Sequence, residues 1–183
     1  MTKIICLCGG PGVGKSTVST GVFTALKQRR ISSEYVSEYA KEITWEGTHK
    51  LLENQIHVFA EQYRRQFRLL NKVEYVVTDS PLLFNSIYFD YYNNSLEKPI
   101  FSREYADLSR TFFDETFKQF DNLIYYLARK KLYDPNGRNQ TLEEAQEIDE
   151  KIIEKLDELQ VPCVILTGTE KENIETILEH LGV

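Results

Sequence analysis

The residues best able to do chemistry lie near the start of the chain, where positions 9–16 read GGPGVGKS. This stretch fits the phosphate-binding pattern G-x-x-x-x-G-K-[ST], the P-loop, at every position. Glycines allow the positive φ angles that bring successive backbone N–H groups close to phosphate oxygens. The lysine of the pattern reaches the β- and γ-phosphates, and the hydroxyl ligates Mg²⁺. The motif therefore predicts nucleotide binding by Gly9, Gly10, Pro11, Gly12, Val13, Gly14, Lys15, Ser16 and Thr17.

The segments on either side of the P-loop support this prediction. Residues 4–8 (IICLC) form a short apolar run, which is typical of a buried parallel strand. After the motif, apolar residues at helical spacing predict a helix that ends in KQRR at 27–30. A strand, a glycine loop and a helix are the context in which this motif binds phosphate, because the positive end of the helix dipole faces the anion.

The rest of the chain alternates apolar strands with helices. Further strands are predicted at 33–37, 73–79, 122–127 and 163–166. Helices are predicted at 52–70, from Ser80 onward, and at 102–120, 141–159 and 169–182, with Thr-x-x-Glu capping boxes at the start of the last two. The pattern predicts one domain over residues 1–183: a three-layer α/β P-loop NTPase fold with a five-stranded parallel sheet.

Composition and charge restrict the partners and the location that we expect for the protein. The net charge is −6, which argues against broad electrostatic binding of nucleic acid, although Arg64, Arg65 and Arg68 could form a local basic track. No apolar run is long enough to span a membrane, and the N-terminal residues show no signal-peptide pattern. The three cysteines all fall in predicted buried strands, as expected for reduced thiols. A cytoplasmic protein without a membrane partner is therefore expected.

Candidate catalytic groups end the predicted strands. Ligands of parallel sheets bind at the carboxyl ends of the strands, where Glu38, Asp79 and Arg129 fall. Phosphoryl transfer to a hydroxyl needs a carboxylate that accepts its proton or orients Mg²⁺. Asp79 is the first candidate, because it ends the strand expected beside the P-loop strand, and it is also the expected partner of Ser16 at the metal. Glu38 is the second, with a helix-terminal acid as the alternative interpretation.

A basic segment at about 129–141 is the candidate flap over the phosphates. A loop that closes could bring the guanidinium groups of Arg129 and Arg138 to the transferred phosphoryl group, or it could be an exposed connection only. The aromatic group at 88–92 could stack on a base, but aromatic side chains at helical spacing usually belong to the core. Phe89 is assigned to the core, and the roles of Tyr88, Tyr91 and Tyr92 stay open.

Among P-loop proteins, the lack of a guanine-reading motif and the length of the chain favour a small-molecule kinase. The string nearest to the guanine-reading pattern N-K-x-D is NKVE at 71–74, which has Glu in place of Asp and precedes a strand rather than following one. Motor and oligomeric ATPases usually have longer chains with a second domain. Small-molecule kinases have compact chains of this kind.

Three segments together resemble one family: GGPGVGKS at 9–16, VSEYAKE at 36–42 and TDSP at 78–81. The chain is similar to the P-loop family named for the kinase domain of NadR-type nicotinamide riboside kinases, which also includes small stand-alone bacteriophage proteins. Lys41 stands where that family tends to have Arg, which removes a bidentate guanidinium. The resemblance implies a nucleoside-kinase-like fold and Mg²⁺-dependent transfer of the γ-phosphate of ATP to a hydroxyl of a nucleoside-like acceptor.

Two alternatives remain open from the sequence. A related kinase could phosphorylate a hydroxymethylated base in DNA, in which case the arginine face at 64–68 would bind the strand. A protein of another class, a nucleotide-binding switch with little catalysis, would need the P-loop but no acceptor. The identity of the acceptor, the preference for ATP over GTP and the oligomeric state are not determined by these motifs.

Overall fold

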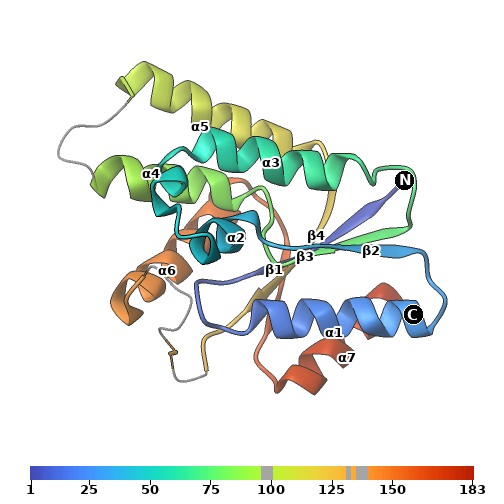
Figure 1. Ribbon diagram of the computed structural model, residues 1–183. Coiled ribbons are helices and arrows are strands. Elements are labelled where there is room, and N and C mark those ends of the chain that lie inside the picture. Colours follow the sequence, from blue (N-terminus) through green and yellow to red (C-terminus); the bar gives the residue numbers. More distant parts are fainter. Residues whose placement is uncertain (96–100, 131–132, 135–139) are drawn as a thin grey trace.

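Five strands form one parallel sheet at the centre of the molecule (Figure 1). The structure, a computed structural model, describes residues 1–95, 101–130, 133–134 and 140–183. The strand order is β2-β3-β1-β4-β5, where the bounds are β1 Lys3–Cys8, β2 Ser33–Val36, β3 Tyr75–Thr78, β4 Asp121–Leu127 and β5 Cys163–Leu166. All four strand pairs are parallel, so the predicted five-stranded parallel sheet is confirmed.

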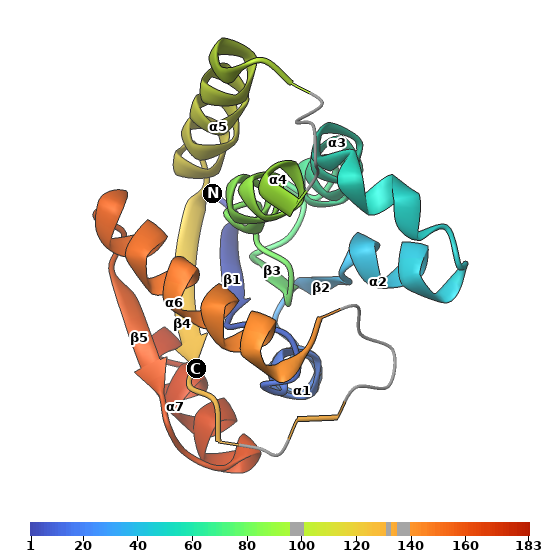
Figure 2. The same ribbon diagram turned by 90° about the vertical axis from the view of Figure 1, so that its left-hand side faces the viewer.

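Helices cover both faces of the sheet, which makes three layers (Figures 1 and 2). One face is covered by α1 (Lys15–Gln28) and α7 (Glu170–Leu181), which pack with Ile5 and Leu7 of β1. The other face is covered by four helices that pack with Ile4 and Cys6: α3 (Gln55–Phe67), α4 (Phe84–Ser95), α5 (Arg103–Lys118) and α6 (Leu142–Glu158). The alternation along β1 explains why a buried parallel strand is apolar at every position.

The register of the central strands brings the predicted site together. Cys6 of β1 pairs with Thr78 of β3 and with Ile124 of β4. The residue after β3, Asp79, therefore lies beside the segment that leaves β1 as the P-loop. Short helix α2 (Tyr39–Trp45) and the 3₁₀ helix η1 (His49–Glu53) follow β2 at the same end of the sheet.

The chain between β2 and α3 differs from the prediction. Residues 39–45 form α2, so Glu38 stands at the start of a helix as in its alternative interpretation, and the helix predicted at 52–70 is divided into η1 and α3. Asn54 causes the division, because its side chain accepts a hydrogen bond from the backbone N–H of His57 (3.2 Å) and so caps a new helix.

Two further expectations need correction. Helix α4 begins at Phe84 rather than at Ser80, because the N–H of Ser80 donates to Thr78 Oγ1 (3.1 Å) and its carbonyl accepts from Gln66 (3.4 Å), which holds a turn. Cys6 and Cys8 are buried as predicted, but Cys163 is only half-buried. It lies on β5, an edge strand of the sheet on which Ile165 is 61% exposed. Within the described residues no helix is long and apolar enough to cross a membrane.

Candidate active site

The P-loop has the backbone conformation that its glycines permit. Gly9, Gly12 and Gly14 have φ angles of 140°, 85° and 102°, which other residues adopt only with strain. Gly10 is needed for space, because a Cβ there would lie 2.5 Å from the carbonyl oxygen of Ala145. Gly14 is the N-cap of α1 and provides no side-chain hydrogen bond, so the first N–H groups of α1 remain suited to an anion.

Lys15 folds back over this loop. Its Nζ donates to the carbonyl oxygens of Gly9 (2.8 Å) and Gly10 (3.0 Å) and lies 5.6 Å from the centre of the Phe84 ring. Burial lowers the pKa of Lys15, and the negative charges of Glu38 and Asp79 oppose that shift. The ammonium group is thus placed between the P-loop and the acidic residues.

Ser16 and Asp79 meet as the sequence predicted. Ser16 Oγ donates to Asp79 Oδ2 (2.5 Å), and Asp79 is only 2% exposed. Its other oxygen, Oδ1, is buried without a hydrogen-bond partner in the described part of the chain. A buried carboxylate oxygen without a partner is unfavourable, and a cation would satisfy it. This donor set of one hydroxyl and one carboxylate fits Mg²⁺ that also binds phosphate oxygens. No cluster of three or more His, Cys, Asp or Glu that could hold a metal occurs among the residues described.

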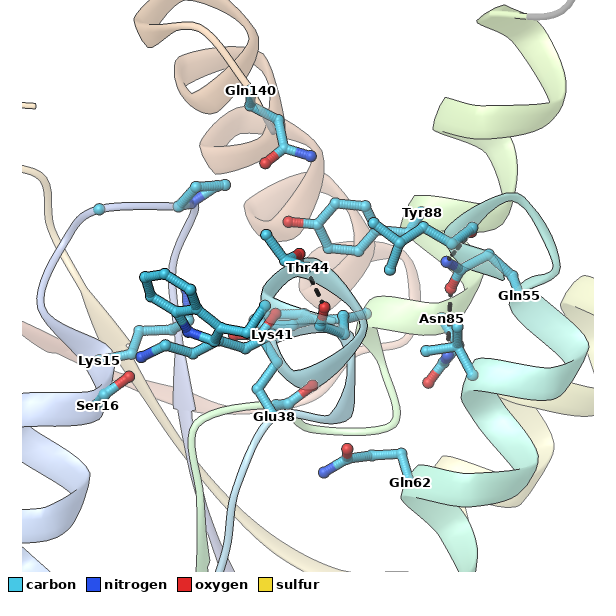
Figure 3. Close-up of a pocket in the computed structure, with 18 of the residues that line it drawn as sticks. Lys15, Ser16, Glu38, Lys41, Thr44, Gln55, Gln62, Asn85, Tyr88 and Gln140 are labelled. Atoms are coloured by element: carbon cyan, nitrogen blue, oxygen red, sulfur yellow. Dashed lines mark hydrogen bonds between the residues drawn. The ribbon is translucent and has the colours of Figure 1, made fainter. Parts of the chain in front are cut away.

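Glu38 lies at the N-cap position of α2, but its side chain makes no capping hydrogen bond. It lines a cavity together with Lys15 and Ser16 (Figure 3). Burial and the charge of Asp79 raise the pKa of Glu38, whereas Lys15 and Lys41 lower it. Asp79 does not line this cavity, so the two candidate carboxylates occupy different environments.

The cavity has a volume of about 340 Å³ and extends from the P-loop to α3 and α4 (Figure 3). Its far end carries three buried amides, those of Gln55, Gln62 and Asn85, each at most 4% exposed. The side-chain amides of Asn85 and Gln55 lie within hydrogen-bond distance of each other, 3.3 Å apart. Gln62 accepts from the backbone N–H of Tyr39 (3.0 Å) and donates to the carbonyl of Ser37 (3.3 Å), which fixes the start of α2.

Aromatic rings form another wall of the cavity. Phe84, Tyr88, Tyr92 and Trp45 line it, and Trp45 is 71% exposed at its edge. The open question about residues 88–92 is thereby answered in part. Phe89 belongs to the core as predicted, at 2% exposed, and the hydroxyl of Tyr91 donates to Glu144 Oε1 (2.8 Å).

The structure describes only part of the predicted flap. Arg138 lies outside the described residues, and Gln140 lines the cavity. Arg129 is held beneath the P-loop: its Nε donates to Asp149 Oδ2 (2.6 Å) and its Nη1 to the carbonyl of Pro11 (2.9 Å). Asp149 also accepts from the N–H of Gly10 (2.5 Å). These contacts give Arg129 a supporting position, and a contact with the transferred phosphoryl group remains a prediction.

The arginine face at 64–68 is largely neutralised by carboxylates. Arg65 donates to both oxygens of Glu42 (2.6 Å each), and Arg64 donates to both oxygens of Glu61 (2.9 and 2.8 Å). The first pair joins α3 to α2, so it positions the helix that follows Glu38. Pairing of these charges with carboxylates lowers their capacity to attract a nucleic-acid backbone.

Sequence reasoning missed the buried amides and Asp149. Polar side chains on an amphipathic helix normally face solvent, so Gln55 and Gln62 on α3 and Asn85 on α4 gave no local signal. The only available signal was spacing: Gln55, Gln62 and Gln66 share a helical face with Phe59. Asp149 gave none, because its partners Arg129 and Gly10 lie 20 and 139 residues away in sequence.

A second cavity lies on the other side of the P-loop. Val13, Lys130, Gly168 and Asn173 are among the residues that line it. The Asn173 side chain accepts from the N–H of Gly168 (2.9 Å) and donates to its carbonyl (3.1 Å), which fixes the loop after β5. The buried side chain of Val13 packs into the core cluster that contains Ile5 and Leu7 of β1.

Comparisons with known proteins agree with this fold. A structure described as NadR protein in complex with NR matches with a TM-score of 0.73 and 20% identity, over 100% of this chain and 52% of that one. A structure of deoxyadenosine kinase from M. mycoides with bound dATP matches with a TM-score of 0.62 and 18% identity, over 98% of this chain and 100% of that one. The chain thus spans about half the length of the NadR protein. No curated protein matches this sequence.

The sheet order, the P-loop and these likenesses define a P-loop protein with the nucleoside-kinase fold. A family model described as an AAA domain matches residues 4–173. The chain belongs to that family, and the resemblance indicated by the sequence motifs is confirmed.

Proposed function

We propose that this protein is a kinase that moves the γ-phosphate of ATP, with Mg²⁺, to a hydroxyl of a nucleoside-like acceptor. One observation carries the proposal: a single cavity joins Lys15 and Ser16 of the P-loop to a carboxylate and to an end lined by amides and aromatic rings. A nucleotide-binding switch would need Lys15 and Ser16 of the P-loop, but neither the carboxylate nor the end lined by amides and aromatic rings. The proteins of similar fold are described with NR and dATP bound, which supports an acceptor of the nucleoside class.

The acceptor end of the cavity is suited to a flat polar ring. Tyr88 and Tyr92 offer faces for stacking, and the Asn85–Gln55 pair offers amide groups to the edge of a base or a carboxamide. The volume of about 340 Å³ suits a small ligand. These features, with the neutralised arginines of α3, favour a free nucleoside such as nicotinamide riboside over a base within DNA.

The donor nucleotide would lie along the P-loop. Backbone N–H groups at the start of α1 and the Lys15 ammonium would hold its phosphates. The second cavity, beyond Val13, would receive its base. Ser16 and Asp79 would hold Mg²⁺, which when bound neutralises charge on the β- and γ-phosphates.

Glu38 is the residue best placed to accept the proton of the acceptor hydroxyl. As the hydroxyl oxygen forms its bond to the γ-phosphorus, the bond from that phosphorus to the β–γ bridging oxygen breaks and ADP leaves. The proton passes to the Glu38 carboxylate. Asp79 instead accepts a hydrogen bond from Ser16 and does not line the cavity. The proposal therefore makes Glu38 the first candidate for the base, whereas the sequence placed Asp79 first.

The decisive experiment measures ADP release with ATP and Mg²⁺ against a panel of ribosides, deoxynucleosides, nucleotides, and DNA with or without hydroxymethylated bases. We expect stimulation by a small nucleoside and a phosphorylated product by mass spectrometry. Lys15→Ala should abolish turnover. Asp79→Asn should leave nucleotide binding nearly intact and remove transfer. Stimulation by modified DNA alone would assign the DNA reaction, and nucleotide binding without any stimulated turnover would assign the switch.

A further inference from the structure

Glu38 lies at a junction of the chain, between the end of β2 and the first turn of α2. Its φ and ψ angles, −65° and 118°, are those of extended backbone, and its own side chain makes no capping hydrogen bond. The first N–H groups of a helix have no acceptor within that helix. The position of Glu38 therefore depends on contacts from outside α2.

Gln62 of α3 makes such contacts on both sides of Glu38. Its Oε1 accepts from the N–H of Tyr39 (3.0 Å), and its Nε2 donates to the carbonyl oxygen of Ser37 (3.3 Å). These partners fix the orientation of the amide, because an N–H only donates and a carbonyl only accepts. Gln62 is 1% exposed, so its amide is shielded from water, and its side chain reaches from α3 toward Glu38 (Figure 3).

Other side chains hold the body of α2 against α3. Ile43 is fully buried in a small apolar cluster with residues of η1 and α3. One turn from Gln62, Arg65 donates to both oxygens of Glu42 (2.6 Å each). We therefore expect α2 to stay docked when Gln62 is replaced, and the particular effect of Gln62 falls on the junction that carries Glu38.

We propose that Gln62 is a positioning residue for phosphoryl transfer: it holds the peptide groups on either side of Glu38 and so keeps this carboxylate in the cavity. The inference deepens the proposed function and rests on it for the role of Glu38 as base. A displacement of about 1 Å at a reacting group costs about a hundredfold in rate. Hydrogen bonds to the backbone before and after the base limit such a displacement.

Steady-state kinetics of Gln62→Met test the proposal, because methionine is also long and unbranched but makes neither hydrogen bond. We expect kcat to fall about 10- to 100-fold, with the KM for the acceptor and the Kd for ATP nearly unchanged. Gln62 also lines the cavity, so direct contact with the acceptor is the competing role. A raised KM with the native kcat would assign that role and overturn the proposal.

Amide hydrogen exchange tests the contact without turnover. The N–H of Tyr39 begins α2, so it should exchange rapidly unless Gln62 accepts from it. We expect slow exchange in the native chain and rapid exchange in Gln62→Met. The matched control is Gln66→Met, because Gln66 is equally buried on the same side of α3 but donates to the carbonyl of Ser80 (3.4 Å). Exchange of Tyr39 should stay slow in this control.

The double variant Glu38→Gln/Gln62→Met tests whether Gln62 acts through Glu38. If it does, the second substitution adds little once the base has been removed, and kcat should stay within about twofold of that of Glu38→Gln. A further tenfold loss, or slow exchange of Tyr39 in Gln62→Met, would overturn the proposal.

Failure of the proposed function gives a different result. A native chain without acceptor-stimulated turnover would refute the kinase reaction and, with it, the role of Glu38 as base. The exchange of the Tyr39 N–H would still decide whether Gln62 holds this segment, because that measurement needs neither ATP nor an acceptor.

Discussion

At the scale of single residues, the two candidate carboxylates of the site have different surroundings. Asp79 is buried against Ser16 with one oxygen lacking a partner among the described residues, as suits a metal ligand. Glu38 lines the cavity that we propose for the acceptor, and burial raises its pKa. Environments that differ in this way allow two groups of the same chemical type to act as metal ligand and as base.

The raised pKa of Glu38 predicts the pH dependence of the reaction. A base acts only when deprotonated, so the rate should be low below the pKa of Glu38 and rise as pH passes through it, with a midpoint above the ordinary value of 4.5. Glu38→Gln should lower kcat by about 10²- to 10⁴-fold and abolish this rise, with nucleotide affinity nearly unchanged. Steady-state kinetics between pH 4 and 8, about the range in which such groups titrate, measure both effects. A normal rate in the Glu38→Gln variant would show that another group accepts the proton.

At the scale of elements, α6 supports the P-loop through one side chain. Asp149 accepts from the N–H of Gly10 and from Arg129, which itself donates to the carbonyl of Pro11. This carboxylate therefore connects the P-loop to Arg129, at the start of the predicted flap, and to α6, the helix that follows the flap. Such a contact fixes the conformation that the glycines merely permit.

Replacing Asp149 should therefore affect nucleotide binding as well as stability. In Asp149→Asn the side chain can still accept from Gly10, but its amide would face the guanidinium of Arg129. We expect the free energy of unfolding to fall by about 1–3 kcal/mol and the Kd for ATP to rise about tenfold. Denaturation and calorimetric titration measure these quantities.

The matched control is Asp114→Asn, which breaks the buried pair of Asp114 with Lys155 (2.7 Å) on α5 and α6, away from the P-loop. It should destabilise the fold comparably and leave ATP affinity unchanged. Equal losses of ATP affinity in both variants would mean that Asp149 acts only through general stability.

At the scale of the whole molecule, the cavity is assembled from both sides of the sheet's carboxyl end. The P-loop contributes one wall, α2 another, and α3 with α4 the third. Trp45, the only tryptophan in the chain, ends α2 at the edge of this cavity and is 71% exposed. Its indole therefore reports whether the walls close on a ligand.

Acceptor binding should shift the fluorescence emission of Trp45 to shorter wavelength, because a ligand in the cavity removes water from an indole that is now exposed. Titration with the acceptor found in the ADP-release assay measures the change. Trp45→Phe should lose the signal while it keeps turnover. Saturation of the enzyme by calorimetry without any spectral change would show that α2 does not contact the acceptor.

The sequence alone determined the fold class and the nucleotide end of the site. The P-loop, the apolar strands and the two capping boxes are local patterns, and the structure confirms each of them. The proximity of Ser16 and Asp79 was also predictable, because both residues end neighbouring strand–loop units at one edge of a parallel sheet.

Only the tertiary structure decided which residues form the proposed acceptor end and which support the P-loop. The roles of Gln55 and Asn85 depend on which side of α3 and α4 faces the cavity, and the role of Asp149 depends on contacts with residues far away in sequence. The sequence alone leaves Arg65 available to nucleic acid, whereas packing places Glu42 against it. Local spacing fixes backbone conformation, whereas a polar side chain takes its function from partners that long-range packing brings to it.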